Sequence, residues 1–494
     1  MKSLKQLGLT HSFFKLGQEF YQKKNPDPVV NPYLIDFNTQ ASKLIGLDPK
    51  ESKKEEFSQY LSGNKLLPGA KPLAMNYAGH QFGVYNPHLG DGRGLLLGEV
   101  EAEAGKIMDI YLKGCGPTCY ARGFDGRATL RSSIREYLGG EALHGLGIPT
   151  SRSLAILGIG ELIYREFPEP AAILVRLSDS HIRFGSFECF HFSNRPDQVT
   201  ILADYVISRY YPKLQNSPDK YLLFFRETLK KMAQLIASWQ SIGFIHGVMN
   251  TDNMAISGVT FDYGPFGFID HFNPDFTSNL SDASRHYALG RQPEIGYWNL
   301  TRLGETLSKL IPQKILAEEL EQYQSIYNRF YKELLGRKLG LSILDSEFTA
   351  LVEKMFQLLY RNPVDYTIFF RSLSNFPRKT PEFLSNSFEV STDLEKWLEA
   401  YGRLIEREDS DPNARREKMD QINPRFILRN YLMQRAIDKA LKESDFSEVG
   451  RLRILLEDPY NDRPEIFQQY KIDADFYASE TPEPLIGTQL SCSA

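Results

Sequence analysis

The chain has 494 residues, of which 42% are hydrophobic and 24% charged, and its formal net charge is −4 at pH 7. This composition is ordinary for globular proteins, and the length is enough for two or three domains' worth of core. A general nucleic-acid-binding protein needs a basic excess, so the acidic balance disfavours that class of function.

The chain has four cysteines, Cys115, Cys119, Cys189 and Cys492. They are too sparse for a disulfide framework and are typical of a reducing compartment. No apolar run is long enough to span a bilayer. The first residues, MKSLKQLGLTHSFF, have neither the apolar stretch nor the cleavage site of a secretory signal. We therefore expect a cytoplasmic protein.

Residues 1–75 mix short apolar patches with charges and prolines, which predicts a wrapping segment with short helices. Beyond them, the pattern predicts strands over 95–100 and 107–113, preceded by the glycine-rich run Gly90-Asp91-Gly92-Arg93-Gly94. In a kinase N-lobe, a glycine-rich loop covers the phosphates and a lysine on the third strand contacts them. Lys113, at the end of the second predicted strand, fits that lysine. A tight hairpin turn is an equal alternative for the glycines, although Arg93 favours phosphate binding.

Residues 128–145 show helical spacing and include Glu136, which is the kind of residue that holds the strand lysine in kinases. A solvated helix carboxylate is the alternative for Glu136. Strands are predicted over 153–158 and 172–176. Arg176 and Arg183 follow, and on spacing alone surface charges are favoured over phosphate clamps.

An amphipathic helix is predicted over 221–242, ending at Gly243. Directly after it comes His246-Gly-Val-Met-Asn-Thr-Asp-Asn253, and then Asp262-Tyr-Gly264. These runs match the kinase pattern H-R-D-L-x-x-x-N and its D-F-G, except that Val248 replaces the catalytic Asp. The metal-binding Asn and Asp remain, and a second carboxylate, Asp252, precedes the Asn. The pattern predicts a nucleotide and Mg²⁺ site without ordinary kinase chemistry. Asp270, in Phe268-Ile269-Asp270, is an alternative metal ligand, but Asp262 is favoured because Gly264 follows it.

Helical patterns cover about 298–338, 345–361 and 392–408, and Asn423-Pro424 predicts the start of another helix. The predicted fold class is α+β, a protein-kinase-like two-lobed fold with a β-rich N-lobe, a helical C-lobe, and N- and C-terminal helical extensions. The expected divisions are an N-terminal segment over 1–75, an N-lobe over 76–180, a C-lobe over 181–340 and a C-terminal extension over 341–494.

Together these motifs make the chain resemble the selenoprotein O/YdiU family of kinase-fold proteins. The resemblance rests on Tyr77–Gly83, Leu89–Arg93, Leu112–Gly114, Asp125–Tyr137, His181–Phe187, His246–Asn253, Asp262–Gly267, Asn423–Asn430 and the terminal Ser-Cys-Ser. It implies protein adenylylation, with AMP moved from ATP to a Ser, Thr or Tyr hydroxyl, or UMP from UTP, using Mg²⁺ or Mn²⁺. It also implies that the nucleotide lies reversed relative to kinases.

The resemblance further implies a role for each site residue. The nucleotide contacts would be Gly90, Gly92, Arg93, Lys113, Asp125, Gly126, Arg176, Arg183 and Asp262, with Glu136 orienting Lys113. Asn253 and Asp262 would bind the metal, and Asp252 would accept the proton. Many bacterial members have a Cys in the loop after D-Y-G that pairs with the C-terminal Cys. Residues 271–280 have none, so Cys492 lacks that partner.

Three functions remain in view: protein nucleotidyltransferase, γ-phosphate phosphotransferase and nucleotide-sensing pseudokinase scaffold. Val248 argues against the second, and the retained Asp252, Asn253 and Asp262 argue against the third. We expect protein substrates, no nucleic acid, no membrane and a monomeric state.

Overall fold

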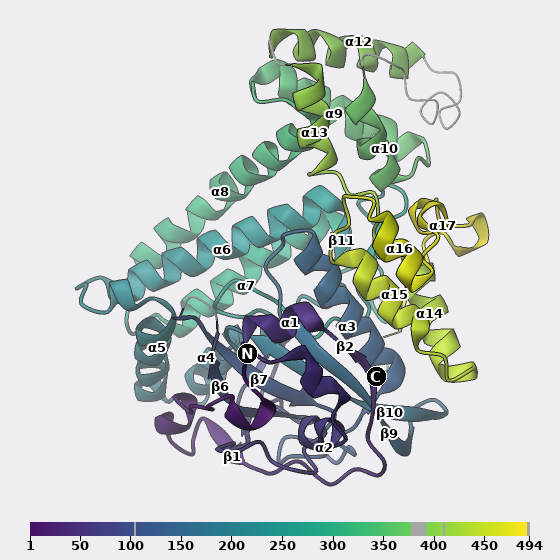
Figure 1. Cartoon of the computed structure of the whole chain (residues 1–494). Coiled ribbons are helices and arrows are strands. Elements are labelled where there is room, and N and C mark those ends of the chain that lie inside the picture. The colour runs from purple at the N-terminus through teal and green to yellow at the C-terminus, as the bar shows by residue number, and fades with distance from the viewer. Residues whose placement is uncertain (103–104, 377–391, 409–410, 492–494) are drawn as a thin grey trace.

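The computed structural model describes residues 1–102, 105–376, 392–408 and 411–491. An antiparallel sheet occupies the first part of the chain, and helices make up most of the rest (Figure 1). The sheet order is β1-β3-β6-β7-β10-β9-β2, with β8 paired to β10. Its strands are β1 (Tyr21–Lys23), β2 (Tyr33–Phe37), β3 (Leu73–Met75), β6 (Gly94–Glu101), β7 (Ile107–Lys113), β8 (Ala128–Thr129), β9 (Arg152–Tyr164) and β10 (Pro168–Ser178).

The strands predicted over 95–100, 107–113, 153–158 and 172–176 are confirmed as parts of β6, β7, β9 and β10. The N-terminal segment, residues 1–75, also contributes strands to the sheet, which the sequence did not predict. It contains the short helices α1 (Thr39–Leu44) and α2 (Glu56–Leu61), but it also supplies β1 and β2, the two edge strands of the sheet. These strands were missed because three to five residues are too few for a period-two pattern to emerge.

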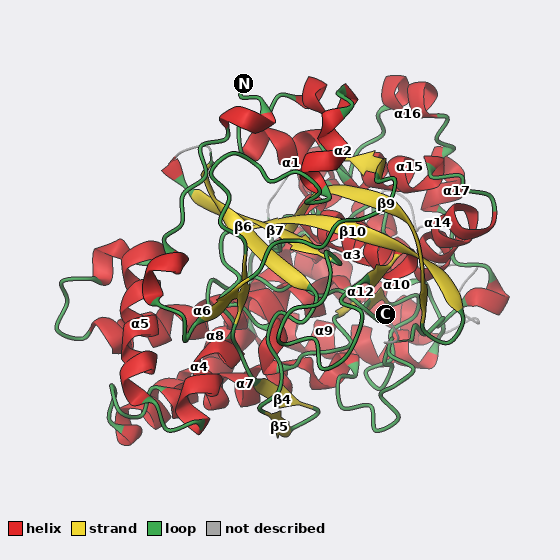
Figure 2. Ribbon diagram, turned by 90° about the horizontal axis from the view of Figure 1, so that it is seen from below, coloured by secondary structure: helices red, strands yellow, loops and turns green. Residues whose placement is uncertain are grey.

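Side chains alternate between the two faces of the sheet, as the pleat requires. Leu95 and Leu97 pack on the face covered by α1 and α2, whereas Leu96 between them packs on the opposite face. That opposite face is covered by α3 (Leu130–Gly145), which the sequence predicted, and Figure 2 shows the sheet between these helices. The sheet therefore holds α3 in a fixed position relative to β7 and β10.

The helix α6 (Lys220–Ile242) is the helix predicted over 221–242, and Gly243 ends it in a left-handed conformation with φ 69°. It packs against α7 (Gln292–Thr306) and α8 (Gln313–Leu339). The single helical pattern over 298–338 was wrong, since two helices occupy it. Pro312 precedes α8, and a proline has no N–H to continue the helix before it.

The remaining helices form two groups. One group lies around the end of α8, and the other lies beside α3, where α14 and α15 pack (Figure 1). The first group is α9 (Ser346–Arg361), α10 (Tyr366–Ser372), α12 (Thr392–Arg407) and α13 (Pro412–Asp420). The second is α14 (Asn430–Lys442), α15 (Ser447–Leu456), α16 (Pro464–Tyr470) and α17 (Ala474–Ala478). No helix within the described ranges is both long and apolar enough to cross a membrane.

The helix start predicted at Asn423-Pro424 was wrong, because α14 begins at Asn430. The Asn423 side chain instead donates its Nδ2 hydrogen bond to the carbonyl oxygen of Lys338, 2.8 Å away. Lys338 lies in the last turn of α8, where carbonyls have no partner within the helix. Asn423 thus stabilises the end of a helix far from it in sequence.

The other strands and α-helices lie along the chain between the elements already described. They are β4 (Gly79–Gln81) and β5 (Val84–Asn86), which form a separate hairpin, β11 (Phe244–Ile245) and β12 (Gly267–Phe268), which pair with each other, and α4 (Phe184–Phe192) and α5 (Pro196–Tyr210).

Candidate active site

A cavity of about 550 Å³ lies between the sheet and the loops that follow α6. Eleven of the residues that the sequence singled out line it: Gly90, Gly92, Arg93, Lys113, Asp125, Gly126, Glu136, Arg183, Asp252, Asn253 and Asp262. Val248, at the position of the kinase catalytic Asp, also lines the cavity. Arg176 does not line it and is described with the charges below.

The glycine-rich run is not a simple hairpin turn. It connects β5 to β6, and these two strands belong to different sheets. Gly90 has φ 97°, and a Cβ there would lie 2.5 Å from the Tyr120 ring, so only glycine fits. The segment 114–126 covers the run, with the Thr118 hydroxyl donating to the Asp91 carbonyl oxygen over 2.7 Å. This packing holds the glycines at the cavity wall.

Buried ion pairs form the floor of the cavity. We call this set of residues the charge cluster: Lys113, Arg176, Arg183, Asp91, Glu136 and Asp262. Lys113 Nζ lies 2.6 Å from both Glu136 Oε2 and Asp262 Oδ1. Glu136 also accepts a hydrogen bond from Arg176. The solvated-carboxylate alternative for Glu136 is wrong, because its side chain is only 4% exposed.

The two arginines are buried, so the surface-charge alternative for them is also wrong. Arg176 Nη2 donates to Asp262 Oδ1 over 2.8 Å, and Arg183 Nη1 donates to Asp262 Oδ2 over 2.9 Å. Both guanidinium groups lie against the ring of Phe261, at 5.1 Å and 4.4 Å from its centroid. Arg183 reaches the cavity, whereas Arg176 lies behind Asp262 and Glu136.

The cations set the charge state of the two shared carboxylates. Burial alone would raise the pKa of Glu136, but Arg176 and Lys113 together hold it below its usual value. Burial opposes ionisation of Asp262 in the same way, yet Lys113, Arg176 and Arg183 hold its pKa well below the usual range. Asp262 also has φ 64°, in the left-handed region that few non-glycine residues adopt.

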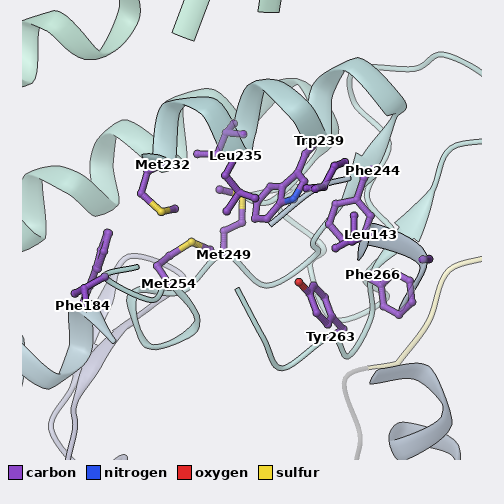
Figure 3. Close-up of a cluster of buried hydrophobic side chains, with 14 of the residues drawn as sticks. Leu143, Phe184, Met232, Leu235, Trp239, Phe244, Met249, Met254, Tyr263 and Phe266 are labelled. Atoms are coloured by element: carbon purple, nitrogen blue, oxygen red, sulfur yellow. The ribbon is translucent and has the colours of Figure 1, made fainter. Parts of the chain in front are cut away.

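Apolar anchors on both sides fix the loop that contains Asp252 and Asn253. Figure 3 shows Met249 and Met254 directed toward α6, where they join Met232 and Leu235 in one buried cluster. Both methionines are fully buried. The four polar residues between them are therefore held at the cavity wall by hydrophobic burial on either side.

Asp252 lies beneath the β4–β5 hairpin. Its Oδ2 accepts a hydrogen bond from Gln81 Nε2 over 3.3 Å, whereas its Oδ1 is buried without a hydrogen-bond partner. A Cβ on Gly79 would lie 3.0 Å from Oδ1, so the hairpin backbone approaches the carboxylate closely. Burial raises the pKa of Asp252 to about 7, against the opposing effect of Arg183. A carboxylate in this state can accept a proton near neutral pH.

The donor set suits a hard divalent cation. Asn253 donates its Nδ2 hydrogen bond to the Val248 carbonyl oxygen over 2.8 Å, so its side-chain oxygen remains an acceptor at the cavity. Within the described ranges, no three His, Cys, Asp or Glu side chains form a metal site of their own. Asn253 and Asp262 therefore fit a metal that takes its other ligands from phosphates and water. Asp270 is used elsewhere, since it accepts hydrogen bonds from Thr481 and from the Gly487 amide.

The cavity residues missed by sequence reasoning include Gln81, Tyr120, Arg122 and Arg165. Arg165 lies in the β9–β10 turn and pairs with Asp125 through two hydrogen bonds of 2.8 Å and 3.0 Å. Gln81 lay inside a quoted motif, but no spacing rule connects it with Asp252. Cys492 lies outside the described residues, so the prediction about its partner stays a prediction.

Comparison with known proteins gives one consistent result. The family described as "Protein adenylyltransferase SelO" matches residues 3–456. A "Protein nucleotidyltransferase YdiU" of Myxococcus xanthus is 44% identical, and proteins of the same name from Pseudomonas entomophila and Thiobacillus denitrificans are each 43% identical. Each of these alignments covers 100% of both chains.

Proposed function

The chain belongs to the SelO family of protein adenylyltransferases, and on that premise we propose that it moves AMP from ATP to Ser, Thr or Tyr hydroxyls of proteins and releases pyrophosphate. That the chain is a protein nucleotidyltransferase follows from the family. The choice of ATP over UTP, the acceptor residue and the role of each side chain are our proposals.

One observation carries the proposal: the carboxylate that can act as base is Asp252, and the usual kinase position is occupied by the apolar Val248. Because the base is displaced along the loop, it would take the proton of a hydroxyl that attacks a phosphorus atom elsewhere than the γ-phosphorus of ATP in a kinase. The α-phosphate of a reversed nucleotide is such a place. Its leaving group is pyrophosphate, which needs cationic partners of its own, and Lys113 and Arg183 of the charge cluster line the cavity where they can supply them.

The reaction then proceeds as an in-line displacement. The acceptor hydroxyl oxygen forms a bond to the α-phosphorus while the bond from that phosphorus to the bridging oxygen breaks. The hydroxyl proton passes to Asp252 Oδ2, the oxygen that Gln81 also contacts. Lys113 and Arg183 bind the negative charge that gathers on the pyrophosphate. Arg176, which is 1% exposed, does not reach the cavity and instead holds Glu136 and Asp262 in place through its ion pairs with them.

Asn253 and Asp262 are the residues that would hold Mg²⁺ or Mn²⁺. A divalent cation bridging phosphate oxygens offsets the charge that develops on them. Both oxygens of Asp262 already accept hydrogen bonds from Lys113 and the two arginines. Holding a metal would therefore require Asp262 to give up some of these hydrogen bonds, and phosphates that attract Lys113 and Arg183 would favour that change. Metal and nucleotide should bind together.

We also propose the protein-kinase-like two-lobed arrangement for the fold. The sheet with α3 would correspond to the N-lobe, and α6 with the loops after it to the C-lobe. The pairing of Lys113 on β7 with Glu136 on α3 supports this, because kinases join the same two elements in the same way. The free thiols of Cys115, Cys119 and Cys189 support a cytoplasmic location. A monomeric state is proposed as well.

The test is to incubate the protein, Mg²⁺ and candidate protein acceptors with α-³²P-ATP and, separately, with γ-³²P-ATP. Label transferred only from the α position supports the proposal. Label only from the γ position would overturn it in favour of a phosphotransferase. No label on any acceptor, together with measurable ATP binding, would favour a nucleotide-sensing scaffold.

A further inference from the structure

The β4–β5 hairpin is fixed to the loop that contains Asp252. The His80 amide donates to the Thr251 hydroxyl over 2.7 Å, and the Phe82 amide donates to the Tyr287 hydroxyl over 2.9 Å. The Tyr287 hydroxyl in turn donates to Asn250 Oδ1 over 2.6 Å. The first strand and the turn of the hairpin are thus held, directly or through Tyr287, against the loop that contains Asp252.

The two faces of this hairpin differ. His80 and Tyr85 lie on one face and pack against α4, where His80 pairs with Glu188 and the Tyr85 ring lies 4.4 Å from Phe192. Side chains alternate along a strand, so Gln81 belongs to the opposite face, together with Val84, its partner across the hairpin.

That opposite face borders the reacting carboxylate. Gln81 donates to Asp252 Oδ2 and accepts from Asn86 Nδ2, each over 3.3 Å. Val84, beside Gln81, is 70% exposed. An apolar side chain is thus open to solvent directly across the hairpin from Gln81, the side chain that contacts Asp252.

Phe82 adds an exposed aromatic ring at the turn. It is 41% exposed, and the rest of its ring packs on Tyr287 with 4.9 Å between the ring centroids. Its φ is 51°, followed by Gly83 with φ 81°. Two successive positive φ values are typical of a type I′ turn, which favours Asn-Gly and not a bulky residue at its first position. Phenylalanine here costs backbone strain, and strain of this kind is usually kept where the residue has a function.

We propose that Phe82 and Val84 bind the acceptor polypeptide beside the hydroxyl that is modified, contacting apolar side chains that flank this hydroxyl. We call these two residues the hairpin surface. The inference rests on the proposed function, because it assumes that a protein hydroxyl reaches Asp252 Oδ2. That hydroxyl must come within about 3 Å of Oδ2. An extended chain advances about 3.3 Å per residue, so one or two residues beside the hydroxyl cover the distance across the hairpin from Gln81 to Val84.

The occupant is an extended segment with apolar flanks. Aspartate or glutamate beside the hydroxyl is disfavoured, because a charge pressed against Val84 and Phe82 loses water without gaining a partner. Because the hairpin is anchored, it loses little conformational entropy on binding.

The test variants are Phe82→Asn and Val84→Asn. Phe82→Asn creates the favoured Asn-Gly turn, which offsets the loss of the ring's contact with Tyr287, so the thermal midpoint should change little. Val84→Asn changes an exposed side chain. The matched control is Val30→Asn, at a position outside the cavity whose valine is 56% exposed.

The probes are two fluorescent peptides with one serine each, flanked by leucines in one and by aspartates in the other. Binding is measured by fluorescence anisotropy with Mg²⁺ and α,β-methylene-ATP, which blocks transfer. Labelling is measured separately with α-³²P-ATP. The leucine peptide should bind the wild type and Val30→Asn at least tenfold more tightly than the aspartate peptide. Phe82→Asn and Val84→Asn should lose that preference with nucleotide affinity unchanged.

The outcomes separate this inference from the proposed function. If the two hairpin variants bind the leucine peptide more weakly but the wild type labels no acceptor, the hairpin surface stands as a peptide-binding site and AMP transfer is overturned. Labelling by the wild type, with both hairpin variants equal to Val30→Asn, would overturn the hairpin surface and retain AMP transfer. Failure of the leucine peptide to bind the wild type more tightly than the aspartate peptide also overturns the hairpin surface.

Discussion

Replacing Glu136 by Gln tests the charge cluster directly. The substitution preserves shape and removes one of three carboxylates that face three cations, so the cluster changes from balanced to an excess of one positive charge. Glu136 is 4% exposed and bonds to both Lys113 and Arg176. Breaking a buried pair by removing one partner typically costs about 3–5 kcal/mol, and we expect a loss of that size in the free energy of unfolding.

The same excess charge should favour an anion. The ATP affinity of Glu136→Gln, measured in EDTA by isothermal titration calorimetry, should therefore rise while AMP transfer falls, since Lys113 loses the partner that orients it. Glu141→Gln is the matched control. Glu141 lies on the same helix, is 2% exposed and pairs with Arg152 over 2.7 Å, but it does not line the cavity. It should lose similar stability without gaining affinity. A Glu136→Gln variant as stable as the wild type, or one with no gain in ATP affinity over Glu141→Gln, would refute the reasoning.

Three further outcomes are expected. Gly79→Ala places a Cβ 3.0 Å from Asp252 Oδ1 and should lower kcat about tenfold at unchanged ATP affinity; an unchanged kcat would contradict the close approach. Mg²⁺ alone should give no measurable binding heat, whereas Mg²⁺ should strengthen ATP binding at least tenfold, and tight binding of the metal alone would contradict the proposed exchange at Asp262. Burial lowers the pKa of Lys338 to about 7 from 10.5, so the wild type should gain stability as pH rises from 7 to 10.5. The free energy of unfolding of Lys338→Met should then exceed that of the wild type by about 3 kcal/mol at pH 7. The pKa difference contributes about 5 kcal/mol, and the lost cation–π contact with Phe370 takes away about 2 kcal/mol. In chemical denaturation this advantage should disappear near pH 10.5; an advantage independent of pH would count against a charged Lys338.

The long elements could be predicted from the sequence because each has a strong local signal. The strand β6 has an apolar run, and α6 repeats apolar residues at steps of three and four up to Gly243. The helical pattern over 298–338 was an exception, because the apolar spacing continues across Pro312 while the helical hydrogen bonds of the backbone do not. At Asn423 a cap-like residue serves the end of α8, a partner that lies 85 residues away in the sequence.

The site could be predicted only where a motif fixed the residue types. Lys113, Glu136 and Asp262 were selected separately, and the fold brings both carboxylates within hydrogen-bond distance of Lys113. The burial of Arg176 and Arg183 could not be predicted, because a lone arginine after a strand is usually at the surface. Contacts across more than 150 residues, such as Gln81 with Asp252, leave no periodic signal in the chain.

The most direct test of the central claim is the transfer rate of Asp252→Asn with α-³²P-ATP under single-turnover conditions, alongside its affinity for Mg²⁺ and ATP. If Asp252 accepts the hydroxyl proton, the rate should fall by about 10²- to 10⁴-fold while the affinity changes less than threefold. A variant that transfers AMP at the wild-type rate, or that loses only nucleotide affinity, would contradict the assignment of Asp252 as the base.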